Sequence, residues 1–191
     1  MSKAKSLGEL GLTARSGNAQ TRITAITLDS RQVRPGALFA ALPGSRVHGA
    51  EFIDPALRMG ASAVLTDRAG ALLAAGTLTR HPEVALIVAE DARAALAMTA
   101  ALWFGAQPEV MVAVTGTNGK TSVASFARQL WTALGHAAVN IGTTGVEGAW
   151  EAPMTHTTPD SVTLQSLLAQ AAAEGITHAA MEASSHGLDQ R

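Results

Sequence analysis

The chain has 191 residues, a formal net charge of −1 and no cysteine. This charge argues against a nucleic-acid partner, because binding to a phosphate backbone requires a concentrated basic face. The lack of cysteine excludes disulfides and thiolate metal sites, as in proteins of reducing compartments.

Neither a signal peptide nor a membrane span is expected from the sequence. Residues 6–20 contain Glu9 and Arg15 instead of a continuous apolar segment. The longest nearly apolar stretch, residues 94–106, is too short to cross a bilayer and is interrupted by Thr99. We therefore expect a cytoplasmic protein with no membrane partner.

Residues 22–104 alternate short β-type runs with helical ones, which predicts an α/β fold with helices packed on a parallel or mixed sheet. The predicted strands are residues 23–28, 38–42, 63–66 and 84–88, and the predicted helices are residues 51–59, 69–75 and 91–104. Gly105 and Pro108 interrupt the helical pattern. We place a domain boundary there, with a small N-terminal α/β domain at residues 1–106 and a second domain at residues 107–191.

The second region reads as the first part of a doubly wound parallel sheet of the P-loop type. We predict strands at residues 110–115, 137–141 and 177–183, helices at residues 122–134 and 161–174, and a polar loop up to Thr158. Three parallel strands with two helices would leave an apolar face or edge uncovered. We therefore expect an N-terminal piece of a longer protein, or a truncated product.

The strand at residues 110–115 runs into a phosphate-binding pattern made of Gly116, Thr117, Asn118, Gly119, Lys120 and Thr121, and the next helix begins at Ser122. Glycines let backbone N–H groups approach phosphate oxygens, the helix directs its positive end at them, and the lysine reaches the outer phosphates. The Thr121 hydroxyl is a candidate Mg²⁺ ligand. The loop is a shortened variant, because Val114 stands where the full pattern has glycine.

Lysine usage supports this reading, since the other two lysines, Lys3 and Lys5, lie in the N-terminal tail while arginine supplies the remaining positive charge. A compact ammonium on a flexible stem suits phosphate at this position. The alternative is a glycine-rich turn with a solvated lysine.

Glu182 ends the strand at residues 177–183, and ligands of open α/β sheets bind at the carboxyl ends of strands. Together with Thr121 it is a candidate Mg²⁺ pair, while the alternative is a structural carboxylate that pairs with an arginine or a helix N-terminus. His186 is either a group that acts near the substrate or a hydrogen-bonded structural residue. Residues 155–160 are either part of a site or a loop followed by an N-cap.

Several motifs resemble those of the Mur ligases, the muramyl-peptide ligase family. The most specific is the run from Met181 to Leu188. The others are Leu28-Asp29-Ser30-Arg31 with residues 35–39, residues 115–121, residues 140–143 and residues 157–159. The resemblance covers nearly the whole chain and is strongest to members that add the third amino acid, diaminopimelate or lysine, to UDP-N-acetylmuramoyl-L-alanyl-D-glutamate.

The resemblance implies roles for individual residues. It implies contacts to the UDP group from Leu28, Ser30, Ser45, Arg46 and Val47, and contacts to the muramyl peptide from Thr157, Thr158, Ser184 and Gln190. It implies ATP binding by Gly116, Thr117, Asn118, Gly119, Lys120, Thr121 and Ser122, Mg²⁺ ligands at Thr121 and Glu182, and catalytic positions at Lys120 and His186. Two positions depart from the family, because His48 stands where Asp is usual and His156 where some members have Asn.

The implied activity is ATP-dependent amide formation in peptidoglycan synthesis, through an acyl phosphate of the substrate glutamate. The resemblance also implies a modified lysine, further metal ligands and a C-terminal domain that selects the amino acid, none of which is among these residues. We therefore expect that the piece by itself does not catalyse the reaction. The alternatives are another Mur or folylpolyglutamate-type ligase, a P-loop kinase or GTPase, and a non-catalytic nucleotide-binding module. No guanine- or acceptor-recognising motif follows the loop, which disfavours the kinase and GTPase alternative.

Overall fold

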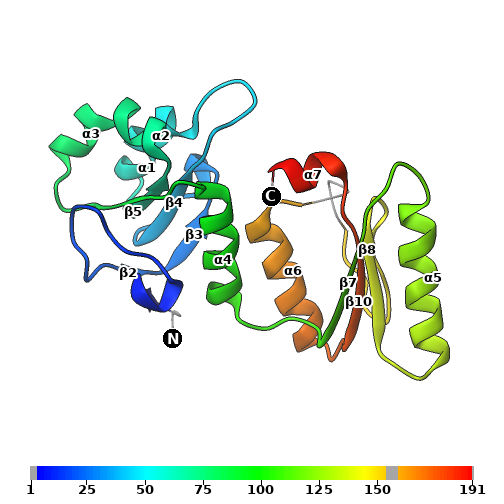
Figure 1. Cartoon of the computed structure of the whole chain (residues 1–191). Coiled ribbons are helices and arrows are strands. Elements are labelled where there is room, and N and C mark those ends of the chain that lie inside the picture. Colours follow the sequence, from blue (N-terminus) through cyan, green and yellow to red (C-terminus); the bar gives the residue numbers. More distant parts are fainter. Residues whose placement is uncertain (1–3, 154–158, 191) are drawn as a thin grey trace. The chain divides into compact units, whose positions relative to one another are not determined.

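The computed structural model describes residues 4–153 and 159–190. The chain divides into two compact units, Met1–Trp103 and Phe104–Arg191 (Figure 1). Each unit contains its own sheet and is described by itself. Within the described residues, no helix combines the length and apolarity that a membrane crossing requires.

The first unit is built on a parallel sheet with the strand order β3-β4-β5-β6. Its strands are β3 (Ala25–Thr27), β4 (Ala37–Ala41), β5 (Ala61–Thr66) and β6 (Ala85–Val88), and a separate antiparallel pair consists of β1 (Lys5–Ser6) and β2 (Arg22–Ile23). The α-helices are α1 (Ile53–Arg58), α2 (Arg68–Leu73), α3 (Ala75–Arg80) and α4 (Ala92–Phe104). Three short 3₁₀ helices are η1 (Gly8–Leu10), η2 (Ser30–Gln32) and η3 (Gly49–Phe52).

Both faces of this sheet are covered, which explains why all five residues of β4 are apolar and buried. On one face Phe39 and Val64 pack with Ile53 of α1 in a single buried cluster. On the other face Leu38 and Leu65 are also fully buried. Figure 1 shows α4, which contributes the fully buried Leu96 and Ala100, on the side of the sheet away from α1, α2 and α3.

The predicted elements of this unit need three corrections. The strand predicted at residues 23–28 is wrong as one element, because it is interrupted at Thr24, whose N–H donates to Gly36 and whose hydroxyl donates to the carbonyl of Pro35. The helix predicted at residues 51–59 begins as the 3₁₀ helix η3. Helix α3 was not predicted, because it contains a single large apolar residue, Leu78, and so shows no apolar periodicity.

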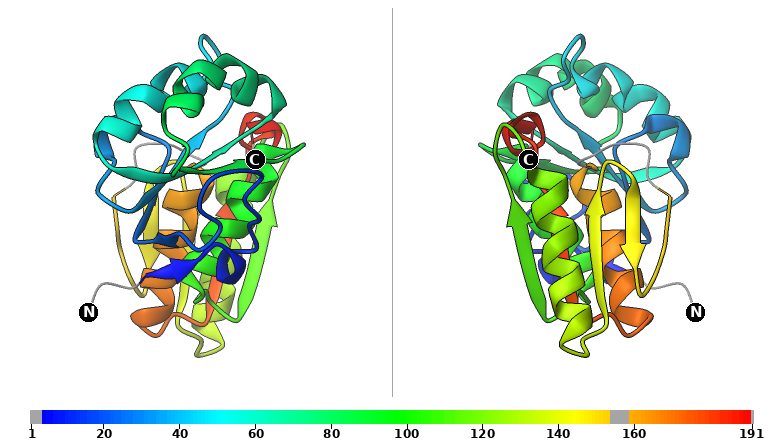
Figure 2. Two further views of the ribbon diagram at one scale, coloured as in Figure 1. Left: turned by 90° about the vertical axis from the view of Figure 1, so that its left-hand side faces the viewer. Right: turned by 90° about the vertical axis from the view of Figure 1, so that its right-hand side faces the viewer.

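The second unit contains a four-stranded sheet with the order β7-β10-β8-β9. Its strands are β7 (Val110–Val114), β8 (Ala138–Gly142), β9 (Gly145–Gly148) and β10 (His178–Glu182), and its helices are α5 (Lys120–Ala133), α6 (Ser161–Ala173) and α7 (Ser185–Gln190). The first three strands of that order are parallel, and α5 and α6 cover opposite faces of the sheet (Figures 1 and 2).

Two elements of this unit differ from the prediction. Strand β9 forms a hairpin with β8 inside the stretch predicted as a loop up to Thr158, and it pairs antiparallel at the sheet edge. Helix α7 follows the last strand, where no helix was predicted. Both are short segments with little apolar periodicity, so their formation depends on contacts that the local sequence does not indicate.

An apolar surface of this unit is exposed, which confirms the expectation of an uncovered face or edge. Strand β7 lies at the edge of the sheet and exposes Val110 and Val112 by 38% and 39%. Four apolar residues at helical spacing on α5 and its C-cap are also exposed. They are Val123, Phe126, Leu130 and Leu134, with exposed fractions from 52% to 73%.

Candidate nucleotide and substrate sites

The loop between β7 and α5 has the backbone of an anion cradle. Gly116 and Gly119 have φ angles of 146° and 81°, a region that side chains other than glycine rarely adopt. Gly119 is the N-cap residue of α5, so the N–H groups of the first helical turn face the loop. These N–H groups and the positive end of the helix dipole favour an anion at this place.

The ammonium of Lys120 lies over this loop. Its Nζ donates to the carbonyl of Gly116 at 2.8 Å and lies 3.4 Å from the carbonyl of Thr117. The ammonium is thereby held against the carbonyls of the loop. The structure therefore places the lysine over the loop, in the position that the prediction requires.

The Glu182 side chain contacts residues that follow two different strands, β7 and β8. Glu182 is only 3% exposed, and one of its carboxylate oxygens accepts a hydrogen bond of 2.9 Å from the hydroxyl of Thr121. The other oxygen accepts a 3.1 Å hydrogen bond from the backbone N–H of Thr143, just after β8. These bonds compensate a buried carboxylate, which would otherwise be costly. Among the described residues, no arginine is at ion-pair distance from Glu182, whereas its partner Thr121 lies in the first turn of α5, so the alternative of a carboxylate at a helix N-terminus stays open.

Gly142 makes room for this carboxylate, a role that the sequence did not reveal. A Cβ atom at Gly142 would lie 2.0 Å from Oε1 of Glu182, far inside contact distance. The position therefore requires glycine for steric reasons. The glycine-rich stretch at residues 142–145 was the available signal, but a contact over 40 positions of sequence cannot be read from it.

The donor atoms at this point fit a hard divalent cation. Mg²⁺ prefers oxygen ligands and usually takes only one or two carboxylates, with water and phosphate oxygens completing its shell. The Thr121 hydroxyl and the Glu182 carboxylate supply such oxygens within hydrogen-bond distance of each other. Within the described parts of the chain, no group of three or more His, Cys, Asp or Glu residues forms a protein-only metal cage.

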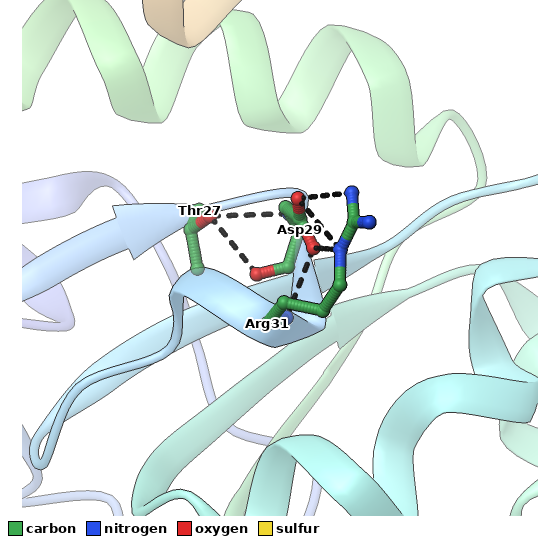
Figure 3. Close-up of polar contacts among 3 residues, drawn as sticks. All are labelled: Thr27, Asp29 and Arg31. Carbon is green, nitrogen blue, oxygen red and sulfur yellow. Dashed lines mark hydrogen bonds and ion pairs between the residues drawn. The ribbon is translucent and has the colours of Figure 1, made fainter.

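The first predicted substrate segment, which contains Leu28 and Ser30, lies at the carboxyl end of β3. Asp29 is the N-cap residue of η2, and it accepts a hydrogen bond from the N–H of Arg31 and two-pronged contacts from its guanidinium (Figure 3). The Thr27 hydroxyl accepts from the N–H of Asp29 at 3.1 Å. The hydrogen bonds from Arg31 lower the pKa of the Asp29 carboxyl. These contacts fix the turn that carries Leu28 and Ser30.

The second predicted substrate segment follows β4, the strand next to β3. Residues 44–47 form a tight turn in which the N–H of Gly44 donates to the carbonyl of Val47 at 3.1 Å. Ser45, Arg46 and Val47 are exposed at this turn. Because parallel strands end at the same edge, the structure brings both predicted segments to one edge of the first sheet.

The remaining predicted residues are only partly described. Ser184 is placed before α7, where its hydroxyl accepts a 2.9 Å hydrogen bond from the N–H of Gly187. Asp160 accepts from the N–H groups of Val162 and Thr163, which confirms an N-cap for α6. Some predicted positions lie outside what the structure describes, namely Thr157, Thr158 and His156 entirely, and His186 and Gln190 in their side chains.

Two family models match the chain. Residues 22–104 match the Mur ligase family, catalytic domain, and residues 114–191 match the Mur ligase middle domain. Together they cover well over half of the chain.

Among curated relatives, the UDP-N-acetylmuramoyl-L-alanyl-D-glutamate–2,6-diaminopimelate ligase of Brucella melitensis biotype 1 is 52% identical over 90% of this chain and 34% of its own length. The enzyme of the same name from Rhizobium meliloti is 52% identical over 96% of this chain and 36% of its own length. The chain thus spans about a third of the length of these relatives.

Solved structures agree with this relationship. A UDP-N-acetylmuramoyl-L-alanyl-D-glutamate–2,6-diaminopimelate ligase superimposes with a TM-score of 0.77 at 28% identity, over 98% of this chain and 37% of its own. The MurF ligase from Thermotoga maritima in complex with ADP has a TM-score of 0.52 at 22% identity, over 84% of this chain and 32% of its own, and shares the fold. The chain therefore belongs to the Mur ligase family and contains matches to its N-terminal and middle domains.

Proposed function

We propose that the chain supplies the nucleotide-binding parts of an ATP-dependent ligase that adds diaminopimelate to UDP-N-acetylmuramoyl-L-alanyl-D-glutamate in peptidoglycan synthesis. The observation that carries the proposal is the contact between Thr121 and Glu182 beside the glycine-rich loop. The relatives named above support the choice of diaminopimelate over lysine, because both are diaminopimelate ligases.

The proposed reaction has two steps. A carboxylate oxygen of the substrate glutamate attacks the γ-phosphorus of ATP, so that a new P–O bond forms while the bond to ADP breaks. The amine of the diamino acid then attacks the acyl carbon, inorganic phosphate leaves, and the amine loses a proton. Positioning and neutralisation of charge dominate steps of this kind.

The residues of the second unit are suited to the first step. In our proposal, the N–H groups of residues 116–122 hold the phosphates, and Lys120 moves from the Gly116 carbonyl to the outer phosphates. Thr121 and Glu182 would hold Mg²⁺, which supplies a positive charge that offsets the charge developing on the phosphates. The Thr121 hydroxyl donates to Glu182, so its lone pairs face away from that bond and remain available as ligands.

The residues of the first unit are proposed to bind the uridine nucleotide. Leu28 and Ser30 after β3, and Ser45, Arg46 and Val47 after β4, lie at the carboxyl edge of a parallel sheet, where ligands of open α/β sheets bind. Thr157, Thr158, Ser184 and Gln190 are proposed to contact the muramyl peptide, and His186 is proposed to act close to it, on the basis of the family motifs alone.

Binding is the appropriate readout, because the chain spans about a third of its relatives' length. We would titrate the chain by calorimetry with Mg·ATP and, separately, with UDP-N-acetylmuramoyl-L-alanyl-D-glutamate, using UDP-N-acetylglucosamine as the control ligand. The proposal expects saturable binding of both compounds, and weaker binding of the control because it lacks the muramyl dipeptide. Binding of ATP without the muramyl compound would favour a non-catalytic nucleotide-binding module, and binding of neither would refute the proposal.

A further inference from the structure

His48 connects two segments of the first unit that are 19 positions apart. Its Nδ1 accepts a 3.0 Å hydrogen bond from the N–H of Ala50, which makes His48 the N-cap residue of η3. Its Nε2 lies 3.1 Å from Oδ1 of Asp67, which follows β5. Because Nδ1 acts as the acceptor, the ring proton of the neutral imidazole is on Nε2, and this N–H donates to Asp67.

Asp67 is itself fixed in place. The same oxygen, Oδ1, accepts a 2.7 Å hydrogen bond from the N–H of Gly70 and so caps α2. The side chains of His48 and Asp67 are only 14% and 22% exposed, so water competes little for their hydrogen bond. The imidazole is therefore hydrogen-bonded to a side chain that the N-terminus of α2 already holds in place.

Gly70 provides the space in which the ring sits. A Cβ atom at Gly70 would lie 2.5 Å from Cε1 of His48 and 2.1 Å from the hydroxyl oxygen of Thr66. That hydroxyl is buried and donates to the carbonyl of Ala41 at 2.6 Å. A side chain at position 70 would displace the ring, so the position of the His48 imidazole depends on this glycine.

The connection is made at the base of the turn at residues 44–47. Pro43 and His48 form an antiparallel bridge, and the N–H of Gly49 donates to the carbonyl of Leu42 at 2.8 Å. Position 48 therefore directly follows the turn that presents Ser45, Arg46 and Val47. Whatever fixes His48 also fixes one end of this turn.

We infer that His48 is a positioning residue, which through its hydrogen bond to Asp67 holds the turn at residues 44–47 in the conformation that receives the uridine nucleotide. The inference rests on the proposed function for the identity of the ligand. An aspartate at position 48 could cap Ala50 but would place a second negative charge toward Asp67.

Two substitutions each keep a helix cap but remove the hydrogen bond between His48 and Asp67. In His48→Asn the amide oxygen can replace Nδ1 as acceptor for the N–H of Ala50, but the side chain is too short to reach Asp67. In Asp67→Ser the hydroxyl can still cap α2, but it is too short to reach His48. Asp67→Asn is the matched control, since its amide oxygen can accept from both Gly70 and His48.

The test measures the affinity for UDP-N-acetylmuramoyl-L-alanyl-D-glutamate and the amide hydrogen exchange of Gly44, whose N–H closes the turn. We expect His48→Asn and Asp67→Ser each to weaken binding about tenfold, the size of one lost hydrogen bond, and to accelerate exchange at Gly44. The double variant should be no weaker than either single one. Mg·ATP affinity, and exchange at Gly36, whose N–H donates to Gly60, should stay unchanged.

The outcomes distinguish the two claims. If the unsubstituted chain binds no muramyl compound, the proposed function fails, while exchange at Gly44 still tests the hydrogen-bond connection. If the unsubstituted chain binds and both His48→Asn and Asp67→Ser bind equally well, the inference is wrong. Additive losses in the double variant, or a loss in Asp67→Asn as large as in Asp67→Ser, would also contradict it. Should one of the two single variants fail to fold, the other carries the comparison.

Discussion

The hydroxyl of Thr121 donates a 2.9 Å hydrogen bond to the carboxylate of Glu182, 61 positions further along the chain. The contact exists because β10 pairs in parallel with β7, with Glu182 opposite Val114 at the end of both strands. The carboxylate therefore reaches the loop that follows β7. The two oxygen ligands proposed for a divalent cation and the anion-binding loop therefore lie at the same edge of the sheet.

Replacing Lys120 should affect nucleotide binding and leave the fold intact. Its ammonium contacts the loop carbonyls and no buried partner, so Lys120→Ala should change the free energy of unfolding little. Loss of one charged hydrogen bond to the phosphates should weaken Mg·ATP binding by about 1.5–3 kcal/mol, roughly ten- to a hundredfold. Calorimetry measures the affinity, and Lys120→Arg is the control that keeps the charge but changes its shape. Unchanged affinity in Lys120→Ala would exclude contact between this ammonium and the nucleotide.

Gly142→Ala should displace the carboxylate of Glu182. The added methyl group would lie 2.0 Å from Oε1 of Glu182, so the side chain must shift away from Thr121. We expect a loss of roughly 1–3 kcal/mol in the free energy of unfolding, measured in urea, together with weaker Mg·ATP binding. Gly76→Ala is the matched control, because a Cβ atom there meets only the Arg80 guanidinium, at 3.9 Å. This control should stabilise α3 slightly, by about 0.5–1 kcal/mol. Equal behaviour of the two variants would contradict the steric argument.

Much of the second unit could be predicted from local pattern. The apolar run before Gly116 and the helical spacing after Lys120 indicated a strand, a loop and a helix, and the end of the last strand placed Glu182 on the ligand edge. The structure agrees with these predictions to within about two residues at the helix start. In this segment the local pattern and the tertiary fold favour the same conformation.

The features that were missed depend on contacts between distant residues. The need for glycine at position 142 follows from a side chain on another strand, and the seat of His48 follows from Gly70 and Asp67. The apolar spacing of α5 predicts an amphipathic helix, but whether the stripe is covered depends on what lies beside it. Sequence periodicity does not show which segments lie beside the helix.

Acid should weaken the hairpin of β8 and β9 through Glu147. Hydrogen bonds from Thr144, then from Asn140, and the charge of Arg128 hold the pKa of this carboxyl below its usual value of 4.5. Because the folded-state pKa is the lower one, its stabilisation is complete above the usual value and is lost as pH falls through the lowered pKa. The group is well solvated, so the effect should stay below about 1 kcal/mol.

Urea unfolding at neutral pH and in acid measures this contribution. Glu147→Gln should reduce the loss of stability on acidification, and Thr144→Val should remove part of the same effect, because it removes the largest cause of the lowered pKa. An acid dependence in Glu147→Gln identical to that of the unsubstituted chain would contradict the assignment.

The exposed apolar surface of α5 should bind hydrophobic dyes in the native state. Phe126 and Leu130 are 59% and 66% exposed, so replacing both with Gln should lower native-state fluorescence of anilinonaphthalene sulfonate while changing stability little. Leu168→Gln serves as the contrast. Leu168 is 3% exposed, so this change should destabilise the unit by about 2–5 kcal/mol. Undiminished dye binding in the double variant would show that the dye binds elsewhere.

The central claim is that residues 116–122 and Glu182 together hold a nucleotide with its divalent cation. The most direct measurement is amide NMR of the chain with ATP and trace Mn²⁺, a paramagnetic substitute for Mg²⁺ that broadens nearby resonances. The account predicts selective broadening of the amides of residues 116–122, Thr143 and Ala183, which is weakened in Glu182→Gln. Broadening confined to other parts of the chain, or unaffected by Glu182→Gln, would contradict it.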